Sequence, residues 1–222
     1  MATTRILNPR AVPVIEVDRH LPPVPLERLQ PQALRDRFAQ RAPFEPEHAG
    51  DSHTAFERPP AAASVLVPLV VRPDGLKVLL TRRAEHLRDH AGQISFPGGR
   101  VESHDVDAAA TALRETEEEV GLPRSRIGVI GQLPIYTTVT HFVVTPVVAL
   151  IEPPFELRLD SFEVAEAFEV PLEFLMTPAN HQRHLLAFEG GQRQFLSMPW
   201  GDYFIWGATA AMLRNMYRFL MR

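Results

Sequence analysis

Residues 99–122 read GRVESHDVDAAATALRETEEEVGL, a glycine turn followed by a predicted α-helix. Positions i, i+3 and i+4 of a helix lie on one face. This spacing brings together three carboxylates, those of Glu115, Glu118 and Glu119. Crowded carboxylates raise one another's pKa unless a cation neutralises them, and oxygen ligands favour Mg²⁺ or Mn²⁺. The stretch therefore predicts a helix that binds a divalent metal.

The predicted helix carries start and stop signals and an apolar face. Asp105 or Asp107 could cap its N-terminus, and Gly121 is suited to ending it. Three apolar residues fall roughly opposite the carboxylates: Ala109, Leu113 and Val120. We expect the helix to be buried by this face.

A Glu-rich helix can also be a solvated charged face, which is the usual explanation of a charge run. The order of the surrounding residues favours the metal site. This order resembles the signature box of the Nudix hydrolases, and it consists of Gly99, Asp105, Arg114-Glu115, Glu118-Glu119 and Gly121-Leu122. The chain departs from the box in three ways. Asp105 stands for the usual loop Glu, the spacing from there to Arg114 is one residue longer, and Thr116 replaces an aliphatic residue.

The segment directly before the box, residues 79–99, reads LLTRRAEHLRDHAGQISFPGG. Guanidinium groups bind phosphate bidentately, and backbone amides near a glycine turn add anion-binding donors. The segment is therefore expected to bind substrate phosphates through Arg82, Arg83, Arg88, Gly98 and Gly99. The alternative is that the arginines only solubilise an amphipathic segment. For His90, a hydrogen-bonded structural role is favoured over catalysis.

The same segment resembles the extra motif of the coenzyme A diphosphatase subgroup of Nudix enzymes, and the longer box is similar to that subgroup too. Residues 144–148 and 203–210 also resemble it, so the similarity covers about residues 62–216. It implies an α/β/α sandwich with a mixed sheet. It also implies hydrolysis of the diphosphate of coenzyme A or its derivatives. The products would be adenosine 3′,5′-bisphosphate and 4′-phosphopantetheine or its acyl form.

The resemblance also implies roles for individual residues. Metal ligation falls to the three helix carboxylates, Glu115, Glu118 and Glu119, with Mg²⁺ or Mn²⁺ activating a water molecule. Arg114 can pair with Glu118 one turn away and hold it in place. The general base is a helix carboxylate or a later glutamate, with Glu163 as the first candidate and Glu166 in reserve. The catalytic set is thus Glu118, Glu119, Arg114 and Glu163. The alternative for Glu163 is an exposed acid at a strand start.

Two other functions stay open. The same chemistry could act on another nucleoside diphosphate derivative, such as ADP-ribose or NADH. The protein could instead be a non-catalytic, nucleotide-binding regulator built on a Nudix fold. Nothing in the sequence distinguishes free coenzyme A from its acylated or oxidised forms.

Alternating or β-branched runs punctuated by turn residues predict the remaining elements. The strands are expected at residues 64–71 and 76–81, which form a hairpin, and at 127–133, 142–151 and 163–170. A further hairpin, 184–188 with 193–197, is expected to turn at Gly190-Gly191. Residues 171–176 form a short helix at best, and a closing helix is expected over 205–221. This order predicts an α/β fold with helices flanking a mixed sheet.

The first 60 residues are rich in proline and are expected to form an extended arm, not a second domain. The exception is a short amphipathic helix over residues 31–41, which begins at Pro31 and places Leu34 and Phe38 one turn apart. Residues 61–222 then form the Nudix hydrolase domain. With 222 residues and 45% hydrophobic content, the chain can bury one substantial core.

Composition excludes several classes of function. A net charge of −4 argues against non-specific nucleic-acid binding. The chain has no cysteine, which excludes disulfides, zinc–thiolate sites and thiol nucleophiles. No signal peptide or run of about 18 apolar residues is found, so we expect a soluble, cytoplasmic protein without a membrane partner. The expected partner is a small, coenzyme A-like nucleotide, and such a fold is compatible with a homodimer.

Overall fold

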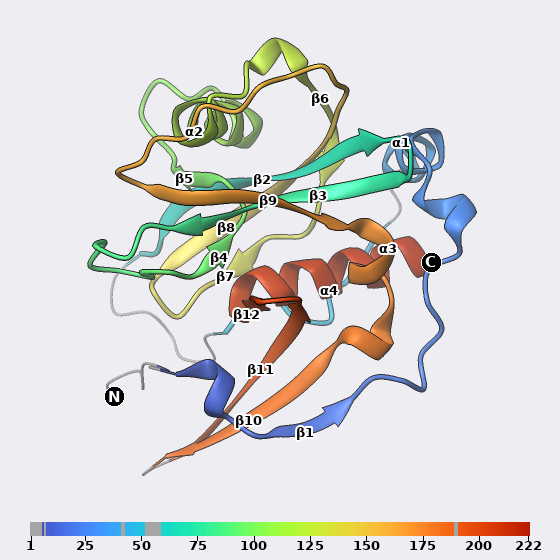
Figure 1. Cartoon of the computed structure of the whole chain (residues 1–222), viewed down its shortest axis with the longest axis vertical. Helices are drawn as coiled ribbons and strands as arrows, with labels where there is room; N and C mark the ends of the chain where they lie inside the picture. The colour runs from blue at the N-terminus through green and yellow to red at the C-terminus, as the bar shows by residue number, and fades with distance from the viewer. Residues whose placement is uncertain (1–5, 7, 41–42, 52–58, 189–190) are drawn as a thin grey trace.

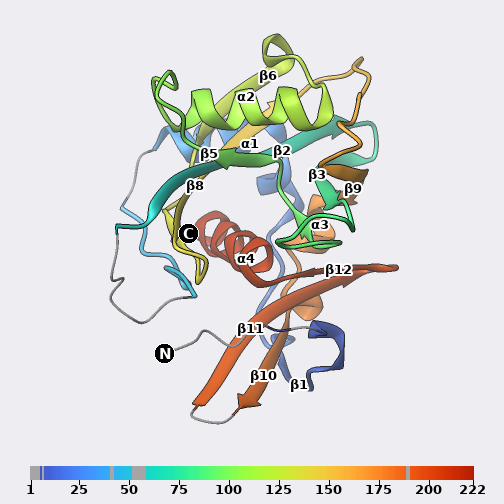
Figure 2. The ribbon, with the colours of Figure 1, turned by 90° about the vertical axis from the view of Figure 1, so that its left-hand side faces the viewer.

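The computed structural model describes residues 6, 8–40, 43–51, 59–188 and 191–222 (Figure 1). Within these residues the strands form an eight-stranded mixed sheet and a four-stranded antiparallel sheet. Helix α2 (Ala108–Val120) covers one face of the larger sheet, and α4 (Gly207–Met221) lies between the two sheets (Figure 2). The expected α/β/α sandwich with a mixed sheet is confirmed, with a small sheet added beyond α4.

The larger sheet is centred on β2 (Ala61–Arg72). This strand runs parallel to β8 (Phe142–Ile151) and antiparallel to β3 (Gly75–Arg83), so the predicted hairpin of β2 and β3 is present. The other strands are β4 (Ile94–Ser95), β5 (Gly98–Arg100), β6 (Ile127–Gln132), β7 (Tyr136–Thr137) and β9 (Val164–Pro171). Strand β9 pairs with β3, which brings the segment before residue 164 next to the end of β3.

Helix α2 begins and ends at the predicted signals. Of the two candidate caps, Asp107 is the one used, because its Oδ1 accepts the N–H of Ala110 at 2.7 Å. Gly121 ends the helix in the left-handed conformation, with φ 68°. Val120 of the predicted apolar face is fully buried, and Ala112 packs against β2 and β8. These contacts fix which face of α2 is turned away from the sheet.

The chain closes on α4, which is almost entirely buried in the main core. The predicted helix started at residue 205, whereas residues 203–206 form strand β12 (Tyr203–Trp206). The difference arises because β12 pairs with β11 (Gly191–Trp200), a contact that local sequence does not reveal. Gly207, with φ 62°, then turns the strand into the helix.

The four-stranded sheet has the order β1-β10-β11-β12. The predicted hairpin is confirmed by the pairing of β10 (Gln182–Phe188) with β11, although its turn residue Gly190 lies outside the described residues. Strand β1 (Val14–Val17) was not predicted, because its pairing partner β10 is far away in the sequence. The N-terminal arm therefore supplies an edge strand of this sheet.

The arm also contributes to the main core. Helix α1 (Pro31–Ala39) starts at the predicted residue and buries Leu34 and Phe38. The ring centroid of Phe38 lies 4.7 Å from that of Phe219. Residue 41, the expected end of the helix, lies outside the described residues. The remaining helices are short: η1 (Pro9–Ala11), η2 (Leu26–Leu29), η3 (Arg124–Arg126), α3 (Leu172–Leu175) and η4 (Pro178–Asn180). Among the described residues, no helix combines the length and hydrophobicity needed to cross a bilayer.

An ionic cluster with a buried centre joins the arm to β10 and α4. We call it the arm clasp, and it consists of Asp18, Glu47, Arg183, Arg214 and Arg218. Arg183 donates two hydrogen bonds of 2.9 Å to Asp18, and Arg214 lies 3.0 Å from the same carboxylate. Burial alone would raise the pKa of Asp18, but the hydrogen bond from Arg183 and the charge of Arg214 hold it below its usual range. Burial would also raise the pKa of Glu47, but hydrogen bonds from His48 and the arginines lower it strongly.

Candidate active site

The carboxylates of α2 are organised by Arg114, whose side chain is almost fully buried. Its Nη1 donates to Glu115 Oε1 at 2.9 Å and to Glu118 Oε2 at 3.1 Å. The expected pairing with Glu118 is therefore present, and Glu115 is held by the same nitrogen. Charge-assisted hydrogen bonds of this kind are among the stronger ones in proteins. Arg114 thus fixes two of the three predicted metal ligands.

Arg114 is itself oriented by Asp105. Nε and Nη2 of Arg114 donate to the two oxygens of Asp105 at 3.1 and 2.9 Å, and Thr111 donates to the same carboxylate at 2.9 Å. These contacts explain why Asp105 does not cap the helix. The hydrogen bonds from Arg114 also hold the pKa of Asp105 well below its usual range. The loop acid of the box is thus a charged anchor for the arginine.

The Gly-Gly turn contacts two of the helix carboxylates. The N–H of Gly98 donates to Glu119 Oε2 at 3.3 Å. A Cβ on residue 99 would lie 2.4–2.6 Å from the carboxylate atoms of Glu115, so only glycine leaves room for that side chain. Gly98 has φ 154°, a conformation that glycine adopts readily. Both glycines, predicted as substrate-binding, thus contact the helix carboxylates directly.

Glu119 is the most buried of the three helix carboxylates, with 6% of its side chain exposed. Its Oε1 lies 3.9 Å from Nη1 of Arg83. Burial raises the pKa of Glu119 to about 8, although Arg83 and the Gly98 N–H oppose the shift. Burial also raises the pKa of Glu115. Protons are thus held more tightly at both positions than on a solvated glutamate, chiefly because of burial and with a smaller contribution from the neighbouring carboxylates.

Glu163 lies close to this cluster. Its negative charge contributes to the raised pKa values of both Glu115 and Glu119. The loop before it is attached to the end of α2, because Asp160 N–H donates to the Glu119 carbonyl at 2.9 Å. The reserve candidate Glu166 lies elsewhere, since its carboxylate pairs with Arg82 at 3.0 Å and accepts a hydrogen bond from the Tyr203 hydroxyl.

The three arginines expected to act as one phosphate-binding group are separated. Strand β3 continues to residue 83, two residues beyond its predicted end, and successive side chains of a strand point to opposite faces. Arg83 faces Glu119, whereas Arg82 lines a cavity of about 530 Å³ with Glu166 and Tyr203. Arg88 is exposed in the loop between β3 and β4. Of the three, Arg83 is the one that lies against a helix carboxylate.

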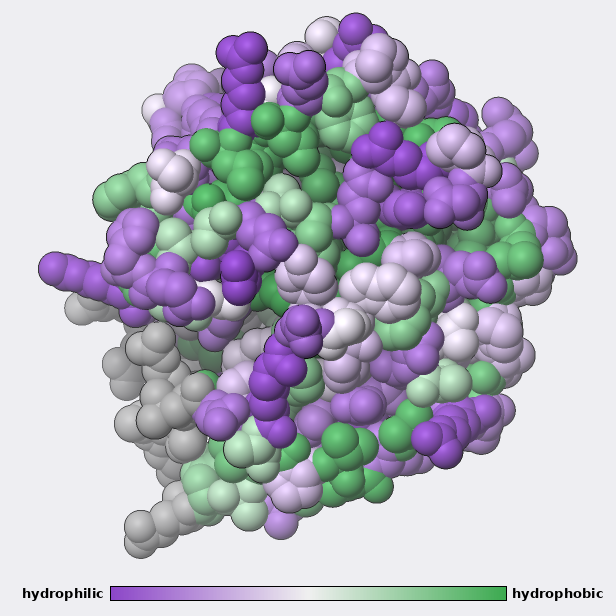
Figure 3. Space-filling model, viewed as in Figure 1, coloured by the Kyte–Doolittle hydropathy of each residue, from purple (hydrophilic) through white to green (hydrophobic). Residues whose placement is uncertain are grey.

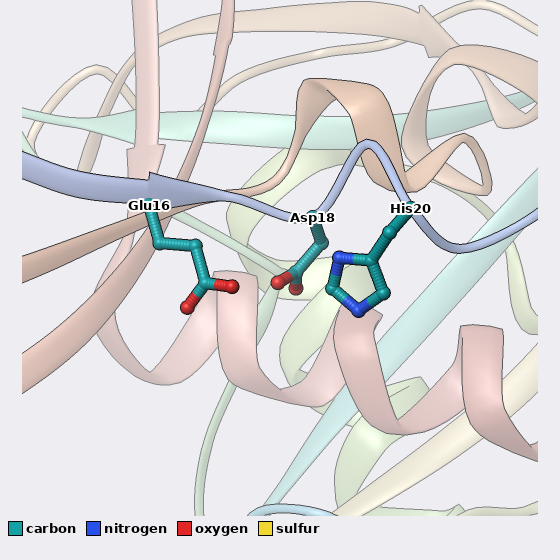
Figure 4. A group of neighbouring side chains, drawn as sticks. All are labelled: Glu16, Asp18 and His20. Carbon is teal, nitrogen blue, oxygen red and sulfur yellow. The ribbon is translucent and has the colours of Figure 1, made fainter.

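A second group of potential metal ligands lies in the arm. Among the described residues, the ligand atoms of Glu16, Asp18 and His20 come within 4.8 Å of one another, and Figure 4 shows the three side chains on the same side of one segment. Both oxygens of Asp18 already contact Arg183 and Arg214, while Glu16 and His20 are exposed. The arginines account for the buried carboxylate, so we assign no metal here.

The ligand atoms of the three α2 carboxylates are not all within 4.8 Å of one another, and Arg114 lies against two of them. Their chemistry nevertheless fits a divalent ion. All are hard oxygen donors, and Glu115 fills the space that a Cβ at residue 99 would need. Glu118 is well exposed, and its carboxylate is accessible from solvent. The residues present are therefore suited to hold a divalent metal ion.

Comparison with known proteins identifies the class. Residues 60–188, more than half of the chain, match the model of the NUDIX domain. The chain therefore belongs to the Nudix hydrolases, which hydrolyse pyrophosphate bonds of nucleoside diphosphate derivatives and generally use divalent metals. Small nucleotides are accordingly its class of substrate.

Similar relatives are the uncharacterized Nudix hydrolases NudL. The protein of Escherichia coli K12 is 46% identical over 156 residues, covering 69% of this chain and 80% of the relative. That of Salmonella paratyphi B is also 46% identical over 156 residues, with the same coverage. The MutT protein from Methanosarcina mazei Go1 superimposes with a TM-score of 0.47 at 20% identity, covering 74% of this chain and 96% of that one. The family assignment rests on the sequence matches.

Proposed function

We propose that this Nudix hydrolase cleaves the diphosphate bond of coenzyme A or its derivatives. The products would be adenosine 3′,5′-bisphosphate and 4′-phosphopantetheine or its acyl form. The observation that carries the proposal is the contact between the upstream segment and α2. Arg83 lies 3.9 Å from Glu119, and Gly98 donates to the same carboxylate. The segment that resembles the coenzyme A subgroup therefore belongs to the same site as the Nudix box.

In this proposal Glu115, Glu118 and Glu119 hold a divalent ion, Mg²⁺ or Mn²⁺. When bound, the ion neutralises phosphate charge and makes water acidic enough to supply hydroxide near neutral pH. Arg114 keeps Glu115 and Glu118 in position through Nη1. The buried anchor Asp105 prevents the guanidinium from turning away.

Arg83 and Glu163 would complete the reaction. The Arg83 guanidinium is less than half exposed and points at the carboxylate cluster, where it can pair with a phosphate oxygen of the substrate. Glu163 lies near Glu115 and Glu119, and its carboxylate can accept a proton from the attacking water. The helix carboxylates Glu118 and Glu119 are the other candidates for this proton acceptor.

Two alternatives lead to different outcomes. The same residues could cleave another nucleoside diphosphate derivative, such as ADP-ribose or NADH. A non-catalytic regulator would need none of the three carboxylates, yet all three are present, which favours an enzyme. A cytoplasmic location and a homodimer stay predictions of the sequence.

A substrate panel tests the proposal. Purified protein is incubated with Mg²⁺ and coenzyme A, ADP-ribose, NADH or dinucleoside polyphosphates, and the products are separated by chromatography. We expect coenzyme A to give the two products named above. Glu118→Gln and Glu119→Gln should each lower turnover by orders of magnitude without unfolding the protein. Turnover of another compound without any turnover of coenzyme A would refute the proposed substrate. Full activity in both variants would refute the proposed metal site.

A further inference from the structure

Phe162 is unusually exposed for a large aromatic side chain. It is 66% exposed, and it is the one aromatic residue among the exposed large hydrophobic residues of the described chain. Its ring centroid lies 4.9 Å from that of His86, with the planes tilted by 57°. On the face seen in Figure 3, hydrophobic patches are small and separated by hydrophilic side chains. An exposed aromatic pair at one place therefore points to a specific contact.

The backbone on both sides of Phe162 is fixed. Its N–H donates to Asp160 Oδ1 at 2.9 Å, and the Asp160 N–H donates to the Glu119 carbonyl at 2.9 Å. On the other side, the N–H of Ala84 donates to the Glu163 carbonyl at 2.9 Å. Figures 1 and 2 show this segment running beside α2 before it enters β9. Phe162 is thus held between the end of the catalytic helix and the loop that carries His86.

Phe162 is also the immediate neighbour of Glu163, whose carbonyl accepts the N–H of Ala84. The residue before Ala84 is Arg83, whose Nη1 lies 3.9 Å from Glu119. The exposed ring therefore lies at the rim of the proposed diphosphate site. The substrates of this family carry a nucleobase attached to that diphosphate. A base has a flat π-face that stacks on exposed aromatic rings, with about 1–3 kcal/mol per base in single-stranded nucleic-acid complexes.

We propose that Phe162, braced by His86, is the surface on which the nucleobase of the substrate stacks. The tilt of 57° places His86 against Phe162 without stacking the two rings face to face. The inference rests on the diphosphate site proposed above, and it adds how one end of the substrate is recognised. It requires no residue of the metal site.

The cavity beside Arg82 is a less suitable place for the base. It contains aromatic side chains, including those of Tyr203 and Trp206. However, Arg82 is paired there with Glu166 and faces away from the Arg83 side of β3, where Glu119 lies. A base in that cavity would lie on the opposite face of the sheet from the carboxylates. Phe162, by contrast, belongs to the segment whose backbone is hydrogen-bonded to the end of α2.

The test measures nucleotide binding separately from turnover. The dissociation constant of AMP, in Mg²⁺, is measured by calorimetry for the unsubstituted protein, Phe162→Ala and Phe162→Tyr. Ile135→Ala removes a comparably exposed apolar side chain, 55% exposed, from the loop between β6 and β7 and serves as the matched control. Phe162→Ala should weaken AMP binding about 5- to 150-fold. Phe162→Tyr keeps the aromatic face and should restore binding, and Ile135→Ala should leave it unchanged.

Kinetics provide the second measurement, with the substrate that the panel identifies. Phe162→Ala should raise KM and leave kcat nearly unchanged, because stacking contributes equally to the bound substrate and the transition state. Binding of 4′-phosphopantetheine should be the same in all variants.

AMP binding that is unaffected by Phe162→Ala, or absent from the unsubstituted protein, would overturn the inference. An equal loss of phosphopantetheine binding would also overturn it, since the ring would then contact the other end of the substrate. Lack of coenzyme A turnover would count against the proposed function alone, because AMP is shared by the alternative substrates.

Discussion

Removing the Asp18 carboxylate should destabilise the protein strongly. Only 1% of Asp18 is exposed, and it accepts two hydrogen bonds from Arg183 and lies 3.0 Å from Arg214, which is fully buried. In Asp18→Ala, the carboxylate of Glu47 remains in the arm clasp and contacts both Arg183 and Arg214. Uncompensated guanidinium charge then stays in the interior, because neither arginine can lose its proton.

The size of the effect follows from the burial. Breaking a buried pair by removing one partner costs about 3–5 kcal/mol. For a domain of this length, each 1 kcal/mol lowers Tm by roughly 2–4 °C, so the expected decrease is about 6–20 °C. Glu16 supplies the control, because it is 55% exposed and 4.0 Å from Arg183. Glu16→Gln should change the free energy of unfolding by no more than about 0.5 kcal/mol.

The pH dependence adds an independent check. The pKa values of Asp18 and Glu47 are lowered by folding, from ordinary values of 3.8 and 4.5. A lowered carboxyl pKa stabilises the folded state above the unfolded value, and this stabilisation is lost as the pH falls below it. The stability difference between the unsubstituted protein and Asp18→Ala should therefore be full near pH 7 and shrink as the pH falls below about 3.8, the ordinary pKa of Asp18.

Urea unfolding at several pH values, together with calorimetry, measures both quantities. A loss below about 1 kcal/mol at pH 7 would contradict the clasp, because an exposed ion pair contributes no more than that. A rise in Tm with Mn²⁺ that disappears in Glu16→Gln and Asp18→Ala would show that the three residues of Figure 4 bind metal instead.

Three further predictions concern the site. Asp105→Asn should lower kcat about 10- to 100-fold, as measured by steady-state kinetics, because Arg114 loses its charged anchor; unchanged kcat would remove Asp105 from the machinery. Gly99→Ala should weaken Mn²⁺ binding about 10-fold or more by calorimetry, because its Cβ would occupy the place of the Glu115 carboxylate; normal affinity would argue against that ligand. Arg83→Ala should raise KM for a diphosphate substrate about 10-fold or more; an unaltered KM would exclude a phosphate contact.

Helix α2 could be predicted from sequence because its signals are local. The cap, the terminal glycine and the spacing of the carboxylates all lie within residues 99–122, and the helix forms between the predicted signals. The choice between Asp105 and Asp107 as cap could not be made, because it depends on Arg114 drawing Asp105 away from the helix start.

What the sequence could not provide was pairing between distant segments. Strand β1 forms because Val14 meets His184, across most of the chain. Arg82 was grouped with Arg83 because the strand was expected to end before them. In the structure Arg82 pairs with residues of both β4 and β9, so the strand continues and the two arginines point to opposite faces. Phe162 was missed because nothing local distinguishes an exposed aromatic residue from a buried one.

The attachment of the loop before β9 to α2 affects how this enzyme can change during evolution. The last carbonyls of a helix lack partners within the helix. In α2, those of Glu119 and Val120 accept the N–H groups of Asp160 and Arg158 at 2.9 and 2.8 Å. These are main-chain bonds, so they persist whatever side chains the loop carries. With the nucleobase stacked on Phe162 as proposed, a mutation at residue 162 would change nucleotide affinity while the helix carboxylates stay where they are. In this scaffold, nucleotide binding can diverge without the hydrolytic chemistry being rebuilt.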